Sequence, residues 1–265
     1  MSHPRVQVIV HAGFHKTGTT SLQSFFSQNK SALAPYLAYY GKDDFPAAGT
    51  QARLYAQRPF PHRLFKFRRA LRAFLQSIPD HATIVLSRET FSGGMPGHRT
   101  LSGRLMTSYQ GPATRLAKII ISELRRRFGP TTEITFFYTT RERESWLRSV
   151  YGHLLRSIRL TEDYESFRAR FPELPGPEIE ARRLAQRLSP VPVHTAALET
   201  YASAPEGPAA ALLDLLEIPP ALRSRLRPVA RQNTANPPEL QADFLRLNRS
   251  IKAKSALKAA KEALL

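Results

Sequence analysis

Small hydroxyl residues, two glycines and a lysine are concentrated in residues 11–23, which read HAGFHKTGTTSLQ. Gly13 and Gly18 have the G-x-x-x-x-G spacing of a nucleotide phosphate loop. Thr19, however, stands where that loop has its lysine, and Lys16 lies two residues before the second glycine. Backbone N–H groups of a glycine-rich turn converge on an anion, and a lysine adds positive charge. The stretch predicts an anion site: a degenerate ATP loop or an intact site for another anion. We call residues 13–21 the anion loop.

The anion loop is predicted to connect a strand to a helix that starts near Thr19. Strands alternate with helical patterns along the chain, which indicates a parallel sheet with right-handed crossovers. We expect one domain over 1–265, with a three-layer P-loop-like α/β fold and a mostly parallel central sheet flanked by helices. The predicted strands are 6–12, 82–87, 133–140 and 191–196.

Two segments rich in glycine, proline and polar residues, 41–65 and 92–112, are predicted to be long loops. Residues 172–178, PELPGPE, are predicted to link two helices. The end of the chain, 239–265, is predicted to be a basic C-terminal helix. That helix either packs on the domain or makes peripheral contact with a membrane surface.

The composition limits the class of protein. Hydrophobic residues make up 42% of the chain, which is typical of a folded globular protein. There is no cysteine, no apolar run of about 18 residues and no secretory signal, so we expect a cytoplasmic protein. The net charge of +18 favours anionic partners. Nucleic acid is disfavoured, since zinc-ligand spacing, ribonucleoprotein motifs and unbroken basic tracts are lacking.

The residues that a magnesium-dependent NTPase requires are not found. Such a site holds Mg²⁺ with a loop hydroxyl and a carboxylate that ends a second strand. Here TIVLSRE reaches Glu89 only after an arginine, and ITFFYTTR ends on Arg141. The parts of the loop that are missing are therefore those concerned with magnesium and the γ-phosphate.

The stretch FHKTGTTSLQ resembles the 5′-phosphosulfate loop of sulfotransferases that use 3′-phosphoadenosine 5′-phosphosulfate (PAPS). The resemblance implies that Lys16 contacts the sulfuryl group and the bridging oxygen of the leaving phosphate. It also implies a 5′-phosphate cradle, to which the loop offers backbone donors and hydroxyls. The residues of this expected cradle are Thr17, Gly18, Thr19, Thr20 and Ser21.

Two later motifs are similar to the same family. The family binds the 3′-phosphate with an arginine that ends a strand and a serine eight residues on, and Arg141 and Ser149 have this spacing. RQNTANPPELQADFLRLN resembles a late loop that closes over the nucleotide. Arg231 is its candidate for the 3′-phosphate, with Asn233 or Thr234 nearby, although an ordinary surface loop is an alternative.

A proton acceptor for the acceptor hydroxyl is expected near the carboxyl ends of the strands. Glu89 is the first candidate, because glycan sulfotransferases use a glutamate in a comparable place. A plain surface carboxylate is the alternative. His11, just before the anion loop, and His15, within it, are rival bases, whereas His98 and His153 show no ligand spacing.

The expected function is transfer of a sulfuryl group from PAPS to a hydroxyl, leaving adenosine 3′,5′-bisphosphate (PAP), with no metal. The acceptor is expected on a carbohydrate or glycolipid. Two alternatives stay open: a kinase or other NTPase with a degenerate loop, and a non-catalytic module that binds anions or nucleic acid. The oligomeric state does not follow from the sequence.

Overall fold

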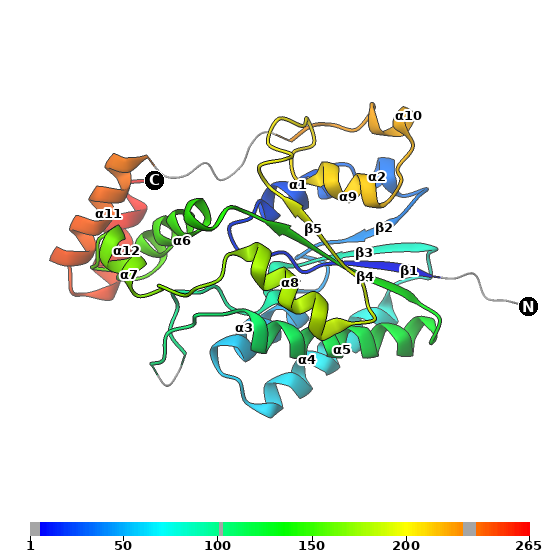
Figure 1. Cartoon of the computed structure of the whole chain (residues 1–265), viewed down its shortest axis with the longest axis horizontal. Coiled ribbons are helices and arrows are strands. Elements are labelled where there is room, and N and C mark those ends of the chain that lie inside the picture. The colour runs from blue at the N-terminus through cyan, green and yellow to red at the C-terminus, as the bar shows by residue number, and fades with distance from the viewer. Residues whose placement is uncertain (1–5, 101–102, 230–236) are drawn as a thin grey trace, which may run out of the picture.

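A computed structural model describes residues 6–100, 103–229 and 237–265 of the chain. Five strands in these residues form one sheet in the order β2-β3-β1-β4-β5, and every pairing is parallel. The expected α/β fold is therefore confirmed (Figure 1). The strands are β1 (Gln7–His11), β2 (Ala38–Tyr40), β3 (Thr83–Ser87), β4 (Glu133–Thr140) and β5 (Val193–Ala197).

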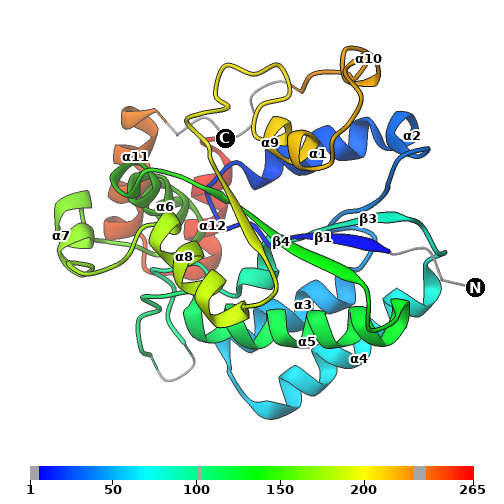
Figure 2. The ribbon, with the colours of Figure 1, turned by 45° about the vertical axis from the view of Figure 1, so that its right-hand side comes forward.

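Helices cover both faces of the sheet, so the fold has three layers, as Figures 1 and 2 show. One face carries α1 (Thr19–Gln28), α2 (Lys30–Leu33), α9 (Ala209–Leu215) and α10 (Pro220–Arg223). The other carries α3 (Pro46–Gln57), α4 (Pro61–Ser77), α5 (Gln110–Phe128) and α8 (Pro177–Leu188). A short 3₁₀ helix, η1 (Glu89–Ser92), follows β3.

The three central strands, β3, β1 and β4, are buried on both faces, whereas the edge strand β5 is mostly exposed. Along β1, Val8 and Val10 pack into one hydrophobic core while Ile9 packs into the other, because side chains alternate along a strand. His11 ends β1 opposite Ser87, the last residue of β3. The carboxyl ends of the central strands therefore meet at one edge, where ligands bind in open α/β sheets.

Two sequence expectations about loops had different outcomes. Residues 92–112 are mostly irregular, with one isolated bridge between Arg99 and Leu105. The predicted long loop 41–65 is wrong, because it contains α3 and the start of α4. Pro46 occupies the first turn of α3, where its missing N–H costs nothing, and Ala48 and Ala52 are buried four residues apart on one face.

The remaining helices lie beyond the carboxyl end of the sheet, where α11 packs on α6 (Figure 1). The tail is two helices rather than one. It packs on the domain through buried Phe244 and Leu257, and buried Lys261 donates to the Ile158 carbonyl at the end of α6 over 2.8 Å. No helix in the described part of the chain is long and apolar enough to cross a bilayer. These helices are α6 (Arg143–Ser157), α7 (Tyr164–Ala169), α11 (Pro238–Ser250) and α12 (Lys254–Glu262).

Candidate functional site

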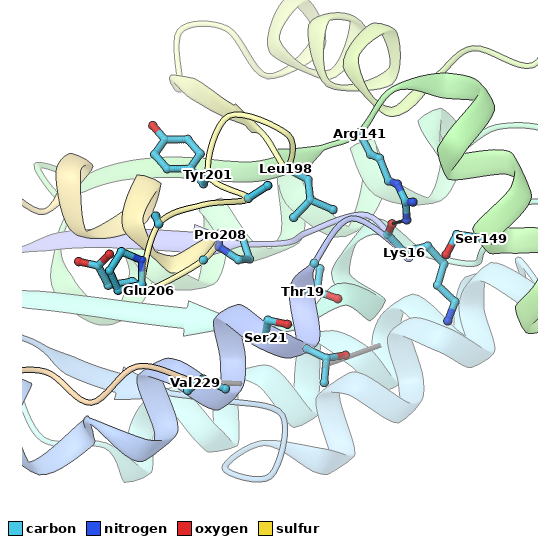
Figure 3. Close-up of a pocket in the computed structure, with 16 residues that line it drawn as sticks. Lys16, Thr19, Ser21, Arg141, Ser149, Leu198, Tyr201, Glu206, Pro208 and Val229 are labelled. Atoms are coloured by element: carbon cyan, nitrogen blue, oxygen red, sulfur yellow. Dashed lines mark hydrogen bonds between the residues drawn. The ribbon is translucent and has the colours of Figure 1, made fainter. Parts of the chain in front are cut away.

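A cavity of about 330 Å³ opens over the start of α1, and we call it the donor pocket (Figure 3). It brings together most of the residues that the sequence singled out for the two phosphate ends of the donor. In Figure 3, Arg141, Ser149 and Lys16 lie at one end, and Tyr201 and Glu206 lie toward the other. The predicted residues that line it are Lys16, Gly18, Thr19, Thr20, Ser21, Arg141 and Ser149.

The backbone of the anion loop is tightly turned. Lys16 and Gly18 both have left-handed backbone angles, with φ of 69° and 87°. A Cβ at Gly13 would lie 2.4 Å from the Thr19 methyl group and 2.6 Å from the His11 ring, so the loop can lie this close to α1 only with glycine there. These features explain why two glycines bracket the loop.

The first turn of α1 is open to an anion. Gly18 is its N-cap, no side chain caps the N-terminal N–H groups, and no acidic residue lies in the first turn. An α-helix leaves its first N–H groups without intrahelical partners and has a partial positive charge at this end. The turn that carries Thr19, Thr20 and Ser21 therefore presents donors and positive potential to the pocket.

Thr17 differs from the expectation in one respect. Its side chain is fully buried, and its hydroxyl donates to the Phe14 carbonyl over 2.7 Å. The same oxygen lies 2.8 Å from the hydroxyl oxygen of Thr139 on β4. Thr17 thus links the anion loop to β4, and its hydroxyl makes both of these hydrogen bonds within the protein.

Lys16 is only partly buried and lies among positive charges. Burial, followed by the charges of Arg156 and Arg141, lowers the pKa of its ammonium group. One Arg141 Nη1–H donates to the Lys16 carbonyl over 3.4 Å, and Nε donates to Ser145 over 3.0 Å. The lysine ammonium would therefore be stabilised by an anion bound at this end of the pocket, since the only carboxylate among the lining residues of the described chain, Glu206, pairs with Arg223.

The β4–α6 connection positions Arg141 and Ser149. The Glu142 carboxylate caps α6 by accepting from the backbone N–H groups of Glu144 and Ser145, each over 2.7 Å. Trp146 Nε1 donates over 2.9 Å to the carbonyl of His15 in the anion loop. Since Ser149 lies one turn further along α6, the loop and the helix are held in a fixed relation.

Glu89 lies just after β3, beside α1. The Gln23 amide donates to Glu89 Oε2 over 3.0 Å. Burial alone would raise the pKa of this carboxyl, but its own backbone N–H and the Gln23 amide hold the pKa below its ordinary value. Glu89 is therefore ionised at neutral pH, as a proton acceptor must be.

The two rival bases are both neutral at pH 7. Burial lowers the pKa of His11 and of His15 to about 4. His11 is fully buried, with Nδ1 2.7 Å from the Ser87 hydroxyl and Nε2 under the anion loop. His15 is partly exposed and lies nearer the surface. Neither Glu89 nor the histidines line the donor pocket itself, and the choice of base stays a prediction.

The sequence reasoning missed the wall opposite the anion loop. It is the segment between β5 and α9, with apolar side chains and a tyrosine that suit a purine ring. These residues carry no motif, and they reach the pocket only because β5 pairs with β4. Arg156, whose positive charge lowers the pKa of Lys16, was missed too. The wall includes Leu198, Tyr201, Pro205 and Pro208, with Val229 from further along the chain.

Two predictions remain without a structural outcome. Arg231, Asn233 and Thr234 lie outside the described residues. Within the described ranges, no three His, Asp or Glu side chains form a group that could hold a metal ion. The metal-free reaction remains a prediction.

The chain was compared with known families and structures. No protein-family profile and no curated protein matches the sequence. A solved structure of the PezAT chromosomal toxin-antitoxin system of Streptococcus pneumoniae is 9% identical, with a TM-score of 0.36, and the match covers 100% of this chain and 90% of that one. Retinol dehydratase, solved with androsterone and the inactive cofactor PAP, is 13% identical with a TM-score of 0.31 and coverage of 100% and 66%. Both likenesses are too weak to assign a family.

Proposed function

We propose that the protein is a sulfotransferase that moves a sulfuryl group from PAPS to a hydroxyl on a carbohydrate or glycolipid. One observation carries the proposal: the anion loop and the Arg141–Ser149 pair line the same pocket. Two candidate anion sites beside a mostly apolar wall match a nucleoside with phosphate at both its 5′ and 3′ positions. A site for ATP would need no second anion site beside the ribose.

The residues of the pocket fit the donor by charge and shape. The open turn of α1 would hold the 5′-phosphate, and the guanidinium of Arg141 with the hydroxyl of Ser149 would hold the 3′-phosphate. Tyr201 and Leu198 would lie against the adenine. PAPS supplies an activated sulfuryl group on its 5′-phosphate.

In this reaction the protein positions the two reactants, neutralises the charge that develops on the leaving oxygen and removes the proton of the acceptor hydroxyl. Glu89 takes the proton of the acceptor hydroxyl, whose oxygen forms a bond to sulfur. The bond between sulfur and the bridging oxygen breaks, and the electron pair stays on that oxygen, where Lys16 neutralises the growing charge. The products are a sulfate ester and PAP.

Thermal stabilisation by PAP tests the proposal. The protein is melted in EDTA with PAP, with AMP, and separately with ATP and magnesium. PAP at 100 times its dissociation constant should add about 2.7 kcal/mol to the free energy of unfolding, and AMP at the same concentration clearly less. Equal shifts with PAP and AMP would remove the case for a 3′-phosphate site. Stabilisation only by ATP with magnesium would favour an NTPase.

Substitution of the lysine tests the chemistry. Loss of a single preorganised donor costs about 3–4 kcal/mol in other enzymes, a hundred- to a thousand-fold in rate. Lys16→Ala should therefore nearly abolish turnover at saturating PAPS. Retention of more than a few per cent of the wild-type rate contradicts the role given to this residue.

A further inference from the structure

A second cavity, which we call the α1 cavity, lies beside the donor pocket. Its volume is about 420 Å³, within the range of about 300–1,000 Å³ for small-molecule sites. One wall is a face of α1, and the opposite wall is the loop 41–44 that follows β2. The α1 side chains recur at helical spacing and are all polar: Thr20, Gln23, Ser24 and Ser27.

The α1 cavity meets the donor pocket at the groups that sulfuryl transfer needs. Thr20, which is exposed, lines both cavities. Gln23 lines the α1 cavity and donates to Glu89 over 3.0 Å, so the candidate base is one hydrogen bond away from this wall. A molecule in the α1 cavity therefore approaches the sulfuryl position from the side of the base.

The charges around the α1 cavity balance, although the whole chain carries +18. Two lysines, Lys30 and Lys42, face two aspartates, Asp43 and Asp44. Lys30 pairs with Asp44 over 3.2 Å, and Asp44 also accepts from the Gly41 N–H over 2.7 Å. No arginine lines this cavity, whereas Arg141 lines the donor pocket. The α1 cavity thus has hydroxyl, amide and carboxylate groups without excess positive charge.

We infer that the α1 cavity is the acceptor site and that it takes a neutral, polyhydroxylated acceptor, such as an uncharged sugar. This inference rests on the proposed function. Sugar hydroxyls both donate and accept hydrogen bonds, which suits serine, threonine, glutamine and aspartate side chains. An acidic sugar would meet the carboxylates of Asp43 and, behind Gln23, Glu89, and like charges disfavour binding. The large basic excess of the chain therefore does not select a polyanionic acceptor.

Filling the α1 cavity tests where the acceptor binds. Ser27→Phe places a bulky ring in the cavity, and Gln28→Phe puts the same ring on the next, exposed position of α1 outside it. We expect Ser27→Phe to raise the KM for the acceptor by about tenfold or more, with Gln28→Phe within about twofold of the wild type. Stabilisation by PAP should be unchanged in both variants. Equal acceptor KM values in the two variants would overturn the location.

Matched acceptors test the chemical class. We would measure transfer of the labelled sulfuryl group from PAPS to p-nitrophenyl glucosides and galactosides, and to the corresponding uronides. In the uronides a carboxylate replaces the hydroxymethyl group. The neutral member of each pair should be preferred by about tenfold or more in kcat/KM. Asp43→Lys should shift this preference toward the uronide, whereas Glu173→Lys, on an exposed residue outside both cavities, should not.

The outcomes separate this inference from the proposed function. Preference for uronides in the wild type, or no transfer to any of the sugars while PAP still stabilises the protein, overturns the neutral-sugar acceptor and leaves the donor site intact. Absence of stabilisation by PAP overturns the proposed function itself, and this inference with it.

Discussion

Removal of the Arg141 guanidinium should weaken the binding of PAP but not of AMP. Arginine has five N–H donors, and two of those in Arg141 are used, on Ser145 at 3.0 Å and on the Lys16 carbonyl at 3.4 Å. The others remain for a 3′-phosphate. A hydrogen bond to a charged group contributes about 1.5–3 kcal/mol, so Arg141→Ala should weaken PAP binding by about 10- to 150-fold.

AMP has no 3′-phosphate and should lose little, because the lost bond to the Lys16 carbonyl is long. Arg141→Lys keeps the charge but loses the planar arrangement of donors, so its affinity for PAP should lie between those of the wild type and Arg141→Ala. Both nucleotides are titrated calorimetrically in EDTA at one ionic strength, since salt weakens charge interactions.

Arg148→Ala is the matched control. This arginine is on the same helix but does not line the donor pocket, and its exposed guanidinium lies 4.1 Å from the centre of the Tyr164 ring. The substitution removes one positive charge from α6 at a position that does not contact the ligand, so PAP affinity should change by less than about threefold. If Arg141→Ala weakened PAP and AMP equally, the arginine would act on the loop and not on the 3′-phosphate.

Three further predictions concern the base, the loop and the response to acid. Glu89→Gln should lower kcat by about 10²- to 10⁴-fold and leave PAP binding intact; normal kcat would transfer the role to a histidine. Gly18→Ala should lower Tm by about 2–6 °C, because alanine is strained at φ 87° and its Cβ would lie 2.8 Å from Leu198, whereas Gly111→Ala, where a Cβ meets nothing within 4 Å, should not. The folded pKa of His11, about 4, is below its unfolded value of 6.5, so the unfolded chain binds more protons between these values and stability falls on acidification. In urea titrations, the free energy of unfolding of His11→Gln should fall by about 2 kcal/mol less between pH 7 and pH 4.5 than that of the wild type. An equal fall in the two proteins refutes this.

Local chemistry made part of the site predictable. The anion loop is continuous in sequence, so residue types and spacing are enough to find it. Arg141 and Ser149 lie eight residues apart on one strand–helix unit, and the resemblance to a family motif singled them out. The four predicted strands are confirmed. β1, β3 and β4 have a clear signal because buried parallel strands are short apolar runs, whereas β5 is a mostly exposed edge strand. β2, with three residues, is too short to give such a signal.

The rest depends on long-range packing. The wall from Leu198 to Pro208 reaches the anion loop only because β5 pairs with β4, and the Leu198 N–H donates to the Thr140 carbonyl over 2.9 Å. Its sequence, LETYASAPEGP, matches no ligand-binding motif. α3 was missed because Pro46 and Gly49 are typical of loops, although tertiary burial of the alanines favours the helix.

Three hydrogen bonds join the anion loop to β4, to Arg141 and to α6. They run between the hydroxyls of Thr17 and Thr139, from Arg141 to the Lys16 carbonyl, and from Trp146 to the His15 carbonyl. The separation between the two proposed phosphate sites is thus set by folding, so a nucleotide that occupies both must match that distance. Adenosine 2′,5′-bisphosphate carries the same charges as the 3′,5′ isomer but places one of them a carbon away, and the protein should reject this isomer on geometry alone.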